Sequence, residues 1–183
     1  IDKISSTGET VWTKFVQTSG KDTTASSGQK SLATDSSGNL YALWRSYKNT
    51  GNNKPNIFLT KYDSSGNSVW EREFGISYAD DKGGGITIDS SNNIYIPSYV
   101  LGQYQGNTTL IAPKFTLRKF NTDGTMILEK ESNTDITISD ITHDSSGNIY
   151  ITGSTSQNNW DYVGQDNSLC CNSGLTDLLV AKL

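Results

Sequence analysis

A five-residue motif that is followed by an aliphatic residue and Tyr occurs three times in this chain of 183 residues, twice as Asp-Ser-Ser-Gly-Asn and once as Asp-Ser-Ser-Asn-Asn. Its copies occupy residues 35–39, 89–93 and 144–148, so they lie 54 and 55 residues apart, and each is followed by an aliphatic residue and Tyr. Self-similarity at a fixed period is typical of repeat proteins, in which each supersecondary unit stacks on its neighbours. This repeat restricts the possible folds more than any other feature of the sequence.

A second motif, which begins with Lys and ends with Gly, recurs every 58 residues, at positions 3–8, 61–66 and 119–124. Apolar and polar residues alternate around the motifs with the period of two that is typical of β-strands. Each motif is therefore predicted to form the turn of a β-hairpin, in which Asp accepts hydrogen bonds from backbone amides and Gly or Asn takes a positive φ. One repeat then contains four short antiparallel strands, called A, B, C and D.

Four antiparallel strands at this period predict an all-β fold, a β-propeller built of four-stranded antiparallel blades, with three repeats in this chain. The segments 61–70, 147–155 and 179–183 resemble the bacterial beta-propeller repeat of the SBBP type, the "seven-bladed beta-propeller repeat". The middle copy departs most from the pattern, since Met126-Ile127-Leu128 stands where another copy has Ser68-Val69-Trp70. The NHL-type propeller repeat, which is shorter by roughly ten residues, is the alternative family.

The predicted organisation is a single propeller segment over residues 1–183. Its parts are an orphan C–D hairpin (1–16), a first blade (30–74), a second blade (85–132) and a third blade that lacks its own strand D (138–183). Rings of about four to eight blades are usual, so open strand edges are expected. We expect residues 10–16 to pair with the strand near 178–183 of a neighbouring blade, either within one chain or between copies. The expected assembly partners are further propeller repeats or another copy of the chain.

Composition excludes several classes of function. The formal net charge is −4 and no block of Lys or Arg occurs, so nucleic acid is not an expected partner. No apolar run approaches the roughly 18 residues that a membrane-spanning helix needs. His143 is the only histidine and no Cys-x-x-Cys occurs, so neither a metal site nor a cofactor is expected. The family resemblance implies an extracellular or bacterial cell-surface location.

The hairpin turns and the loops at the other end of the strands have different predicted roles. The turn residues are interpreted as structural: Asp35, Gly38, Asp63, Gly66, Asp89, Asp144 and Gly147. The B–C loops differ in length between repeats, because strand-A Asp and strand-C Lys are 26, 30 and 38 residues apart. Variable loops on a rigid scaffold usually carry binding function. The predicted ligand-binding residues on these loops and on the D–A connection are Arg45, Tyr47, Tyr78, Asp80, Asp81, Tyr99, Tyr104, Trp160, Asp161 and Tyr162.

Three further features have structural interpretations beside the functional ones. Trp160 and Tyr162 could equally pack their own long loop onto its blade. Trp12 and Trp70 occupy equivalent strand-D positions, which indicates packing between blades. Cys170 and Cys171 are the only cysteines, so an intramolecular disulfide would have to join adjacent residues and would be strained; free thiols or an intermolecular bridge are the alternatives.

The sequence contains no convincing catalytic arrangement, because a single His leaves no Ser-His-Asp or Cys-His set. The predicted function is that of a non-catalytic extracellular binding or scaffold module, which recognises a carbohydrate or protein ligand through the variable loop face. An alternative is a structural subunit of a surface assembly or filament, joined through its edge strands. A glycoside hydrolase that uses Asp80, Asp81 or Asp161 is the third and weakest hypothesis.

Overall fold

The computed structural model describes residues 1–15, 22–24, 30–47, 54–75, 79–100, 103–105, 109–111, 114–132, 136–155 and 177–182. These residues contain β-strands and no helix, which confirms the all-β prediction. The strands are β1 (Asp2–Ile4), β2 (Thr10–Thr13), β3 (Asp22–Thr24), β4 (Leu32–Thr34), β5 (Leu40–Ser46), β6 (Asn56–Tyr62), β7 (Ser68–Phe74), β8 (Lys82–Gly83), β9 (Thr87–Ile88), β10 (Ile94–Val100), β11 (Gln103–Gln105), β12 (Thr109–Ile111), β13 (Lys114–Phe120), β14 (Met126–Ser132), β15 (Ile136–His143), β16 (Ile149–Thr155) and β17 (Asp177–Lys182).

Three antiparallel sheets follow one another along the chain. The first has the order β3-β5-β6-β7 and the second the order β14-β13-β10-β8, and in each a further short strand, β4 or β9, also pairs with the inner strand β5 or β10. The third has the order β15-β16-β17, while β1–β2 and β11–β12 form separate hairpins. In each of the first two sheets, one edge of the inner strand is thus paired with two short strands, β3 and β4 along β5, and β8 and β9 along β10.

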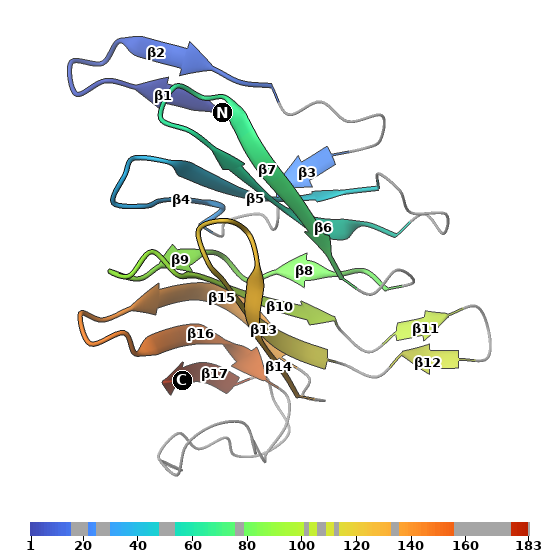
Figure 1. The fold of residues 1–183 in the computed structure, drawn as a ribbon. Coiled ribbons are helices and arrows are strands. Elements are labelled where there is room, and N and C mark those ends of the chain that lie inside the picture. Colours follow the sequence, from blue (N-terminus) through green and yellow to red (C-terminus); the bar gives the residue numbers. More distant parts are fainter. Residues whose placement is uncertain are drawn as a thin grey trace.

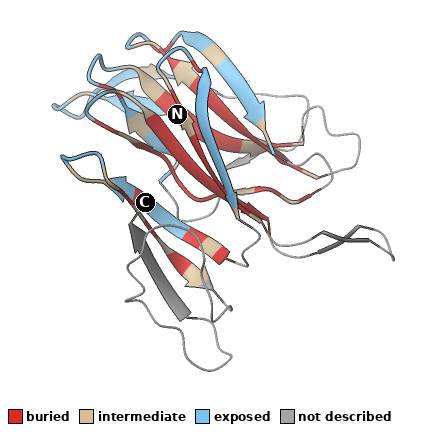
Figure 2. Ribbon diagram, turned by 60° about the horizontal axis from the view of Figure 1, so that its bottom comes forward, coloured by how far each residue is buried: buried red, intermediate tan, exposed pale blue. Residues whose placement is uncertain are grey.

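The sheets are stacked in chain order, with the β1–β2 hairpin at one end of the stack and β17 at the other (Figure 1). One buried cluster joins the first sheet to the second and consists of Tyr41, Leu43, Ile57, Leu59, Ile86, Ile94, Ile96 and Phe120. A second cluster joins the second sheet to the third and consists of Tyr95, Tyr99, Phe115, Leu117, Ile136, Ile138, Ile141, Ile149 and Ile151. The buried residues accordingly lie on the inner strands of the stack (Figure 2).

The stacking order bears on the predicted pairing of the N-terminal strand with residues near 178–183. Among the described strands, β2 pairs only with β1, and β17 pairs only with β16. The two elements lie at opposite ends of the stack, so this pairing does not form within one chain (Figure 1). Pairing between copies remains a prediction.

The pentapeptide forms the turn that connects strand A with strand B. Asp144 Oδ1 accepts hydrogen bonds from the backbone amides of Ser146, at 2.9 Å, and Asn148, at 3.0 Å. Its Oδ2 accepts from Asn148 Nδ2 at 2.7 Å and from Tyr150 Oη at 2.8 Å. The Asn148 side chain contributes most to lowering the pKa of the Asp144 carboxyl, which falls to about 2. Asp35 and Asp89 have the same set of donors, so the Tyr that follows each motif caps the Asp of its own turn.

The second motif forms the turn of a C–D hairpin that occurs three times with one register. Lys3 pairs with Trp12, Lys61 with Trp70 and Lys119 with Leu128, and the register shifts directly after the Lys each time. The first two hairpins each contact the next one along the chain. Lys3 Nζ and Trp12 Nε1 donate to the carbonyl oxygen of Ser64. In the same way, Lys61 and Trp70 donate to the carbonyl oxygen of Thr122.

Candidate binding site at the loop end of the sheets

The A–B and C–D turns lie at one end of the strands, and the B–C and D–A connections lie at the other (Figure 1). We call the second end the loop end. At the loop end of the first sheet, β5 ends at Ser46, opposite Asn56, the first residue of β6. The chain leaves β7 at Phe74 and reaches the second sheet through Asp80 and Asp81. Side chains from four segments therefore meet at this edge.

Arg45 is the central cation of the loop end. Its side chain is 15% exposed, and its Nη2 forms an ion pair with the Asp80 carboxylate, which is 40% exposed. The ion pair joins the C-terminal end of β5 to the connection that leads into β8. The Arg45 Nε atom is buried and has no hydrogen-bond partner among the described residues. A buried guanidinium donor without an acceptor is costly, because its hydration has been lost and not replaced.

Asn56 provides an acceptor at the same end of the sheet. Its side chain is buried, and its Nδ2 donates to Glu73 Oε1 at 2.7 Å. In the part of the chain that the structure describes, the buried Asn56 Oδ1 atom has no hydrogen-bond partner. Glu73 belongs to β7. Its hydrogen bond with Nδ2 sets the orientation of the Asn56 side-chain amide, so Oδ1 points away from Glu73.

Gly75 allows a third polar group to approach Asn56. A Cβ atom at residue 75 would lie 2.7 Å from Asp81 Oδ2 and 3.4 Å from Asn56 Oδ1, so only glycine leaves room for both. Asp81 is 4% exposed. Asn56, Gly75 and Asp81 therefore lie together, and Asp80, the neighbour of Asp81 in the chain, forms the ion pair with Arg45. A hydroxyl group, which both donates and accepts, could be the partner of either the Arg45 Nε donor or the Asn56 Oδ1 acceptor.

The ten predicted ligand-binding residues have different positions. Arg45 and Asp80 form the ion pair, Tyr47 is half-buried directly after β5, and Asp81 is buried beside Gly75. Tyr104 lies in β11, where only the backbone is described. Four more predicted residues lie outside the described residues, as do the two cysteines: Tyr78, Trp160, Asp161, Tyr162, Cys170 and Cys171.

The interpretation of Tyr99 as an exposed ligand contact is corrected by its position. The residue is 4% exposed and belongs to the cluster between the second and third sheets. The sequence analysis placed Tyr99 on a B–C loop, but β10 continues to Val100. Alternation along this strand directs Tyr99 to the same face as Tyr95, which packs against the third sheet.

Sequence analysis did not single out Asn56 and Glu73. Asn56 stands directly before an apolar run, and Glu73 directly follows the charged residues Glu71 and Arg72 on β7, so neither differs from ordinary strand residues. A polar residue that opens a fully buried strand was the only available signal. Among the described residues, no group of three or more His, Cys, Asp and Glu side chains could hold a metal ion. His143 Nδ1 lies 2.9 Å from Thr87 Oγ1, a hydrogen bond between the third and second sheets.

The chain was compared with protein families and known proteins. The family model of the SBBP beta-propeller repeat matches residues 69–96 and 128–160. The first segment runs from β7 into β10, and the second runs from β14 through β16. No curated protein sequence matches the chain. The described residues contain no helix long and apolar enough to cross a membrane.

Two solved structures match part of the chain. A Hadza microbial sialidase, Hz136, has a TM-score of 0.51 and 12% identity, and the match covers 68% of this chain and 31% of that one. A protein of unknown function from Bacteroides caccae has a TM-score of 0.47 and 11% identity, over 88% of this chain and 50% of that one. The chain thus spans half or less of the length of either protein, and such low identities show similarity of fold alone. Two segments of the chain, residues 69–96 and 128–160, therefore resemble the SBBP beta-propeller repeat.

Proposed function

We propose that the chain is a non-catalytic β-propeller module, built of three repeats with four-stranded blades, that binds a carbohydrate through its loop end. In this reading β3 and β4 together form strand A of the first blade, and β8 and β9 form that of the second. The module acts outside the cell or on a bacterial cell surface, as the family resemblance implies. A polar segment of a protein ligand is the other ligand class that fits the same surface.

The observation that carries this proposal is the unpaired Asn56 Oδ1 together with the unpaired Arg45 Nε. Native proteins rarely leave buried polar atoms unsatisfied, so such atoms require a partner. Sugar hydroxyl groups donate and accept hydrogen bonds, and they are commonly bound by amides and ion-paired guanidinium groups. The Arg45–Asp80 pair supports the same ligand class, because it holds the guanidinium in a fixed orientation before a ligand arrives.

A glycoside hydrolase is less well supported. Hydrolysis requires two carboxyl groups on either side of the scissile bond, one of which donates a proton. Asp80 is held by Arg45, and Asp81 is buried beside Gly75. The name sialidase belongs to a protein that is 12% identical, and we do not transfer its activity.

A structural role is the second candidate, and exposed apolar residues on the outer strands favour it. β14 is the edge strand of the second sheet, and its Met126, Ile127 and Leu128 are 47%, 51% and 37% exposed. Val69 on β7, the edge strand of the first sheet, is 54% exposed. Edge strands with apolar side chains recruit other strands, so these residues could join the chain to further repeats or to another copy.

Glycan-array screening of the full chain, followed by calorimetric titration of the best ligand, tests the binding function. Arg45→Lys keeps the positive charge but removes Nε, and Asn56→Ala removes Oδ1; each is expected to weaken binding about tenfold or more. Ser145→Ala, on an exposed turn residue at the opposite end, is the matched control and should bind as the original chain does. Equal loss in all three variants would contradict the site, and hydrolysis of the bound glycan that Asp80→Asn abolishes would establish an enzyme instead.

A further inference from the structure

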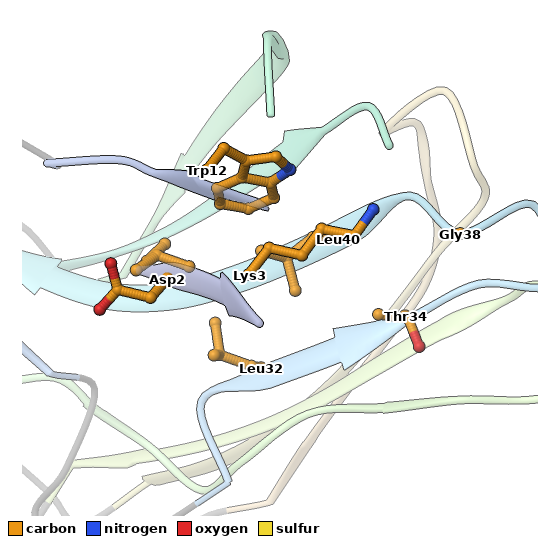
Figure 3. Close-up of a pocket in the computed structure, with 8 residues that line it drawn as sticks. Asp2, Lys3, Trp12, Leu32, Thr34, Gly38 and Leu40 are labelled. Carbon is orange, nitrogen blue, oxygen red and sulfur yellow. The ribbon is translucent and has the colours of Figure 1, made fainter. Parts of the chain in front are cut away.

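A cavity of about 130 Å³ lies between the N-terminal hairpin and the first sheet (Figure 3). Lys3 and Trp12 border it from the hairpin, and Leu32 and Leu40 border it from β4 and β5. The remaining lining residues are Ile1, Asp2, Thr34 and Gly38. The surface is mainly apolar, so it does not resemble a sugar-binding site.

The repeat shows what occupies the equivalent space one interface further along the chain. There Lys61 and Trp70 correspond to Lys3 and Trp12, because both hairpins have the same Lys–Trp pair and the same register shift. Tyr41 fills the space beside them. Its ring centroid is 5.8 Å from that of Trp70 and 5.3 Å from Lys61 Nζ, and its side chain is fully buried.

The position of this tyrosine is fixed by strand pairing. Tyr41 on β5 lies opposite Lys61 on β6, and Tyr95 on β10 lies opposite Lys119 on β13. Lys119 Nζ is 5.0 Å from the centroid of the Tyr95 ring, so the cation–π contact is repeated too. β1 carries the equivalent Lys3, but among the described strands it pairs only with β2. Its other edge is therefore available for a strand with tyrosine opposite Lys3.

The exposure of the leucines that line the cavity also indicates that a tyrosine side chain is missing from it. Leu32 corresponds to Ile86, 54 residues later, and Leu32 is 42% exposed whereas Ile86 is 0% exposed. Leu40 corresponds to Ile94 in the same way and is half-buried, whereas Ile94 is fully buried. Tyr41 is part of the cluster that covers Ile86 and Ile94. The first interface thus has the same apolar walls as the second but lacks the tyrosine between them.

We infer that the free edge of β1 and the cavity beneath Trp12 form a docking site for an extended strand that carries a tyrosine opposite Lys3. The partner is the A–B hairpin of a further repeat of this kind, with the sequence Asp-x-x-Gly-Asn-aliphatic-Tyr. Its backbone pairs with β1, its phenol ring enters the cavity between Trp12 and Leu32, and the Lys3 ammonium lies over the ring. This site is separate from the proposed carbohydrate site.

Nuclear magnetic resonance of the ¹⁵N-labelled full chain tests the inference with two probes. The first is p-cresol, which reproduces the tyrosine side chain, and the second is a synthetic peptide with the sequence of residues 31–47. Both are expected to shift the resonances of Lys3, of the Trp12 indole and of Leu40, and the peptide should bind with a Kd of about 1 mM or tighter. The peptide in which alanine replaces the tyrosine of position 41 should bind about tenfold more weakly.

Variants of the chain separate this site from other surfaces. Leu32→Trp fills the cavity from an exposed position and should abolish binding of both probes, and Thr34→Phe serves the same purpose if the first variant does not fold. Leu128→Ala is the matched control, because Leu128 is the equivalent of Trp12 in the third hairpin. The inference is overturned if neither probe shifts Lys3 and Trp12, if the alanine peptide binds equally well, or if a folded cavity-filling variant retains full affinity.

Discussion

Trp70 donates a hydrogen bond from its indole Nε1 to the backbone carbonyl oxygen of Thr122 at 3.2 Å, across the space between two hairpins. The bond from Trp12 to Ser64, at 3.3 Å, repeats it at the same separation of 52 residues. Arg72 extends the contact by donating from Nε to the Gly124 carbonyl oxygen at 2.8 Å. The tryptophan of one hairpin thus packs on the turn of the next hairpin along the chain.

Gly124→Ala tests the packing of Trp70 on the turn of the third hairpin. A Cβ at residue 124 would lie 3.0 Å from the Trp70 ring, and the residue has a φ of 81°. Gly147 has a φ of 82° but nothing within 4 Å of its Cβ position, so Gly147→Ala is a matched control that carries the backbone penalty alone. That penalty is about 1 to 2 kcal/mol. We expect Gly124→Ala to lower the free energy of unfolding in urea by about 1 kcal/mol more than the control does. Equal losses of unfolding free energy in the two variants would mean that close packing of the Trp70 ring on Gly124 does not contribute to stability.

Trp70→Ala and Leu128→Ala compare the same position in two hairpins. Trp70 packs against the cluster between the first two sheets, and its loss should lower the free energy of unfolding by about 3 kcal/mol. Leu128 is 37% exposed and should cost about 1 kcal/mol or less when truncated. Chemical denaturation followed by fluorescence and circular dichroism measures both. A larger loss at Leu128 would show that its hairpin is covered in solution.

The turns could be predicted from sequence because their chemistry is local. Asp89 and its amide donors lie within four residues of each other, and Asn92 takes the positive φ of 62° that the motif required. The division of strand A could not be predicted in this way, because it depends on residues far apart in sequence. Pro97 has no amide hydrogen to donate, and the Gly84 amide instead binds the Pro97 carbonyl oxygen at 2.7 Å, between β8 and β9.

The candidate site was predictable only in part, for a similar reason. Loop length pointed to the end of the sheets where Arg45 and Asp80, which are 35 residues apart in the chain, form an ion pair. Burial was not visible in the sequence, so Tyr99 was assigned to the surface although β10 continues through it. Asn56 became notable only because its oxygen has no partner, which is a property of packing and not of residue type.

Lowering the pH should weaken the turns. Hydrogen bonds from Asn148 and Tyr150 lower the pKa of Asp144 to about 2 in the folded chain, below its usual value of 3.8. A depressed pKa contributes stability that is fully present above the unfolded value and is lost as the pH falls through the folded value. The midpoint of thermal unfolding should therefore decrease between about pH 4 and pH 2. Burial alone would raise the pKa of Asp35, but its hydrogen bonds outweigh this and lower it, so Asp35 acts in the same direction.

Asp144→Asn is the variant that tests the pH dependence. The amide does not titrate in this range, so the decrease between pH 4 and pH 2 should be smaller than in the original chain. Glu9→Gln, at an exposed position on the first hairpin, controls for the general effect of losing one negative charge. An unchanged slope in Asp144→Asn would show that this turn does not carry the effect.

Gly153 marks the place where the third sheet differs from the other two. β15 runs without a break past β16, with a bulge between Ile138 and Asp140, and a Cβ at residue 153 would lie 2.0 Å from the Thr137 carbonyl oxygen. The second sheet has Ser98 at the equivalent position, and there strand A is divided into β8 and β9. A glycine at position 153 therefore allows β15 to run past β16 as one continuous strand.

Gly153→Ser should consequently force β15 away from β16. We expect a loss of about 3 kcal/mol in the free energy of unfolding, since the clash is with backbone and not with a flexible side chain. Hydrogen exchange should accelerate at Ile138 and Ile141 in the third sheet while the amides of β5 and β6 keep their protection. Ser154→Ala is the control at the next position of the strand and should change little. Unaltered exchange at Ile138 in the Gly153→Ser variant would contradict this account of why only the third sheet keeps strand A whole.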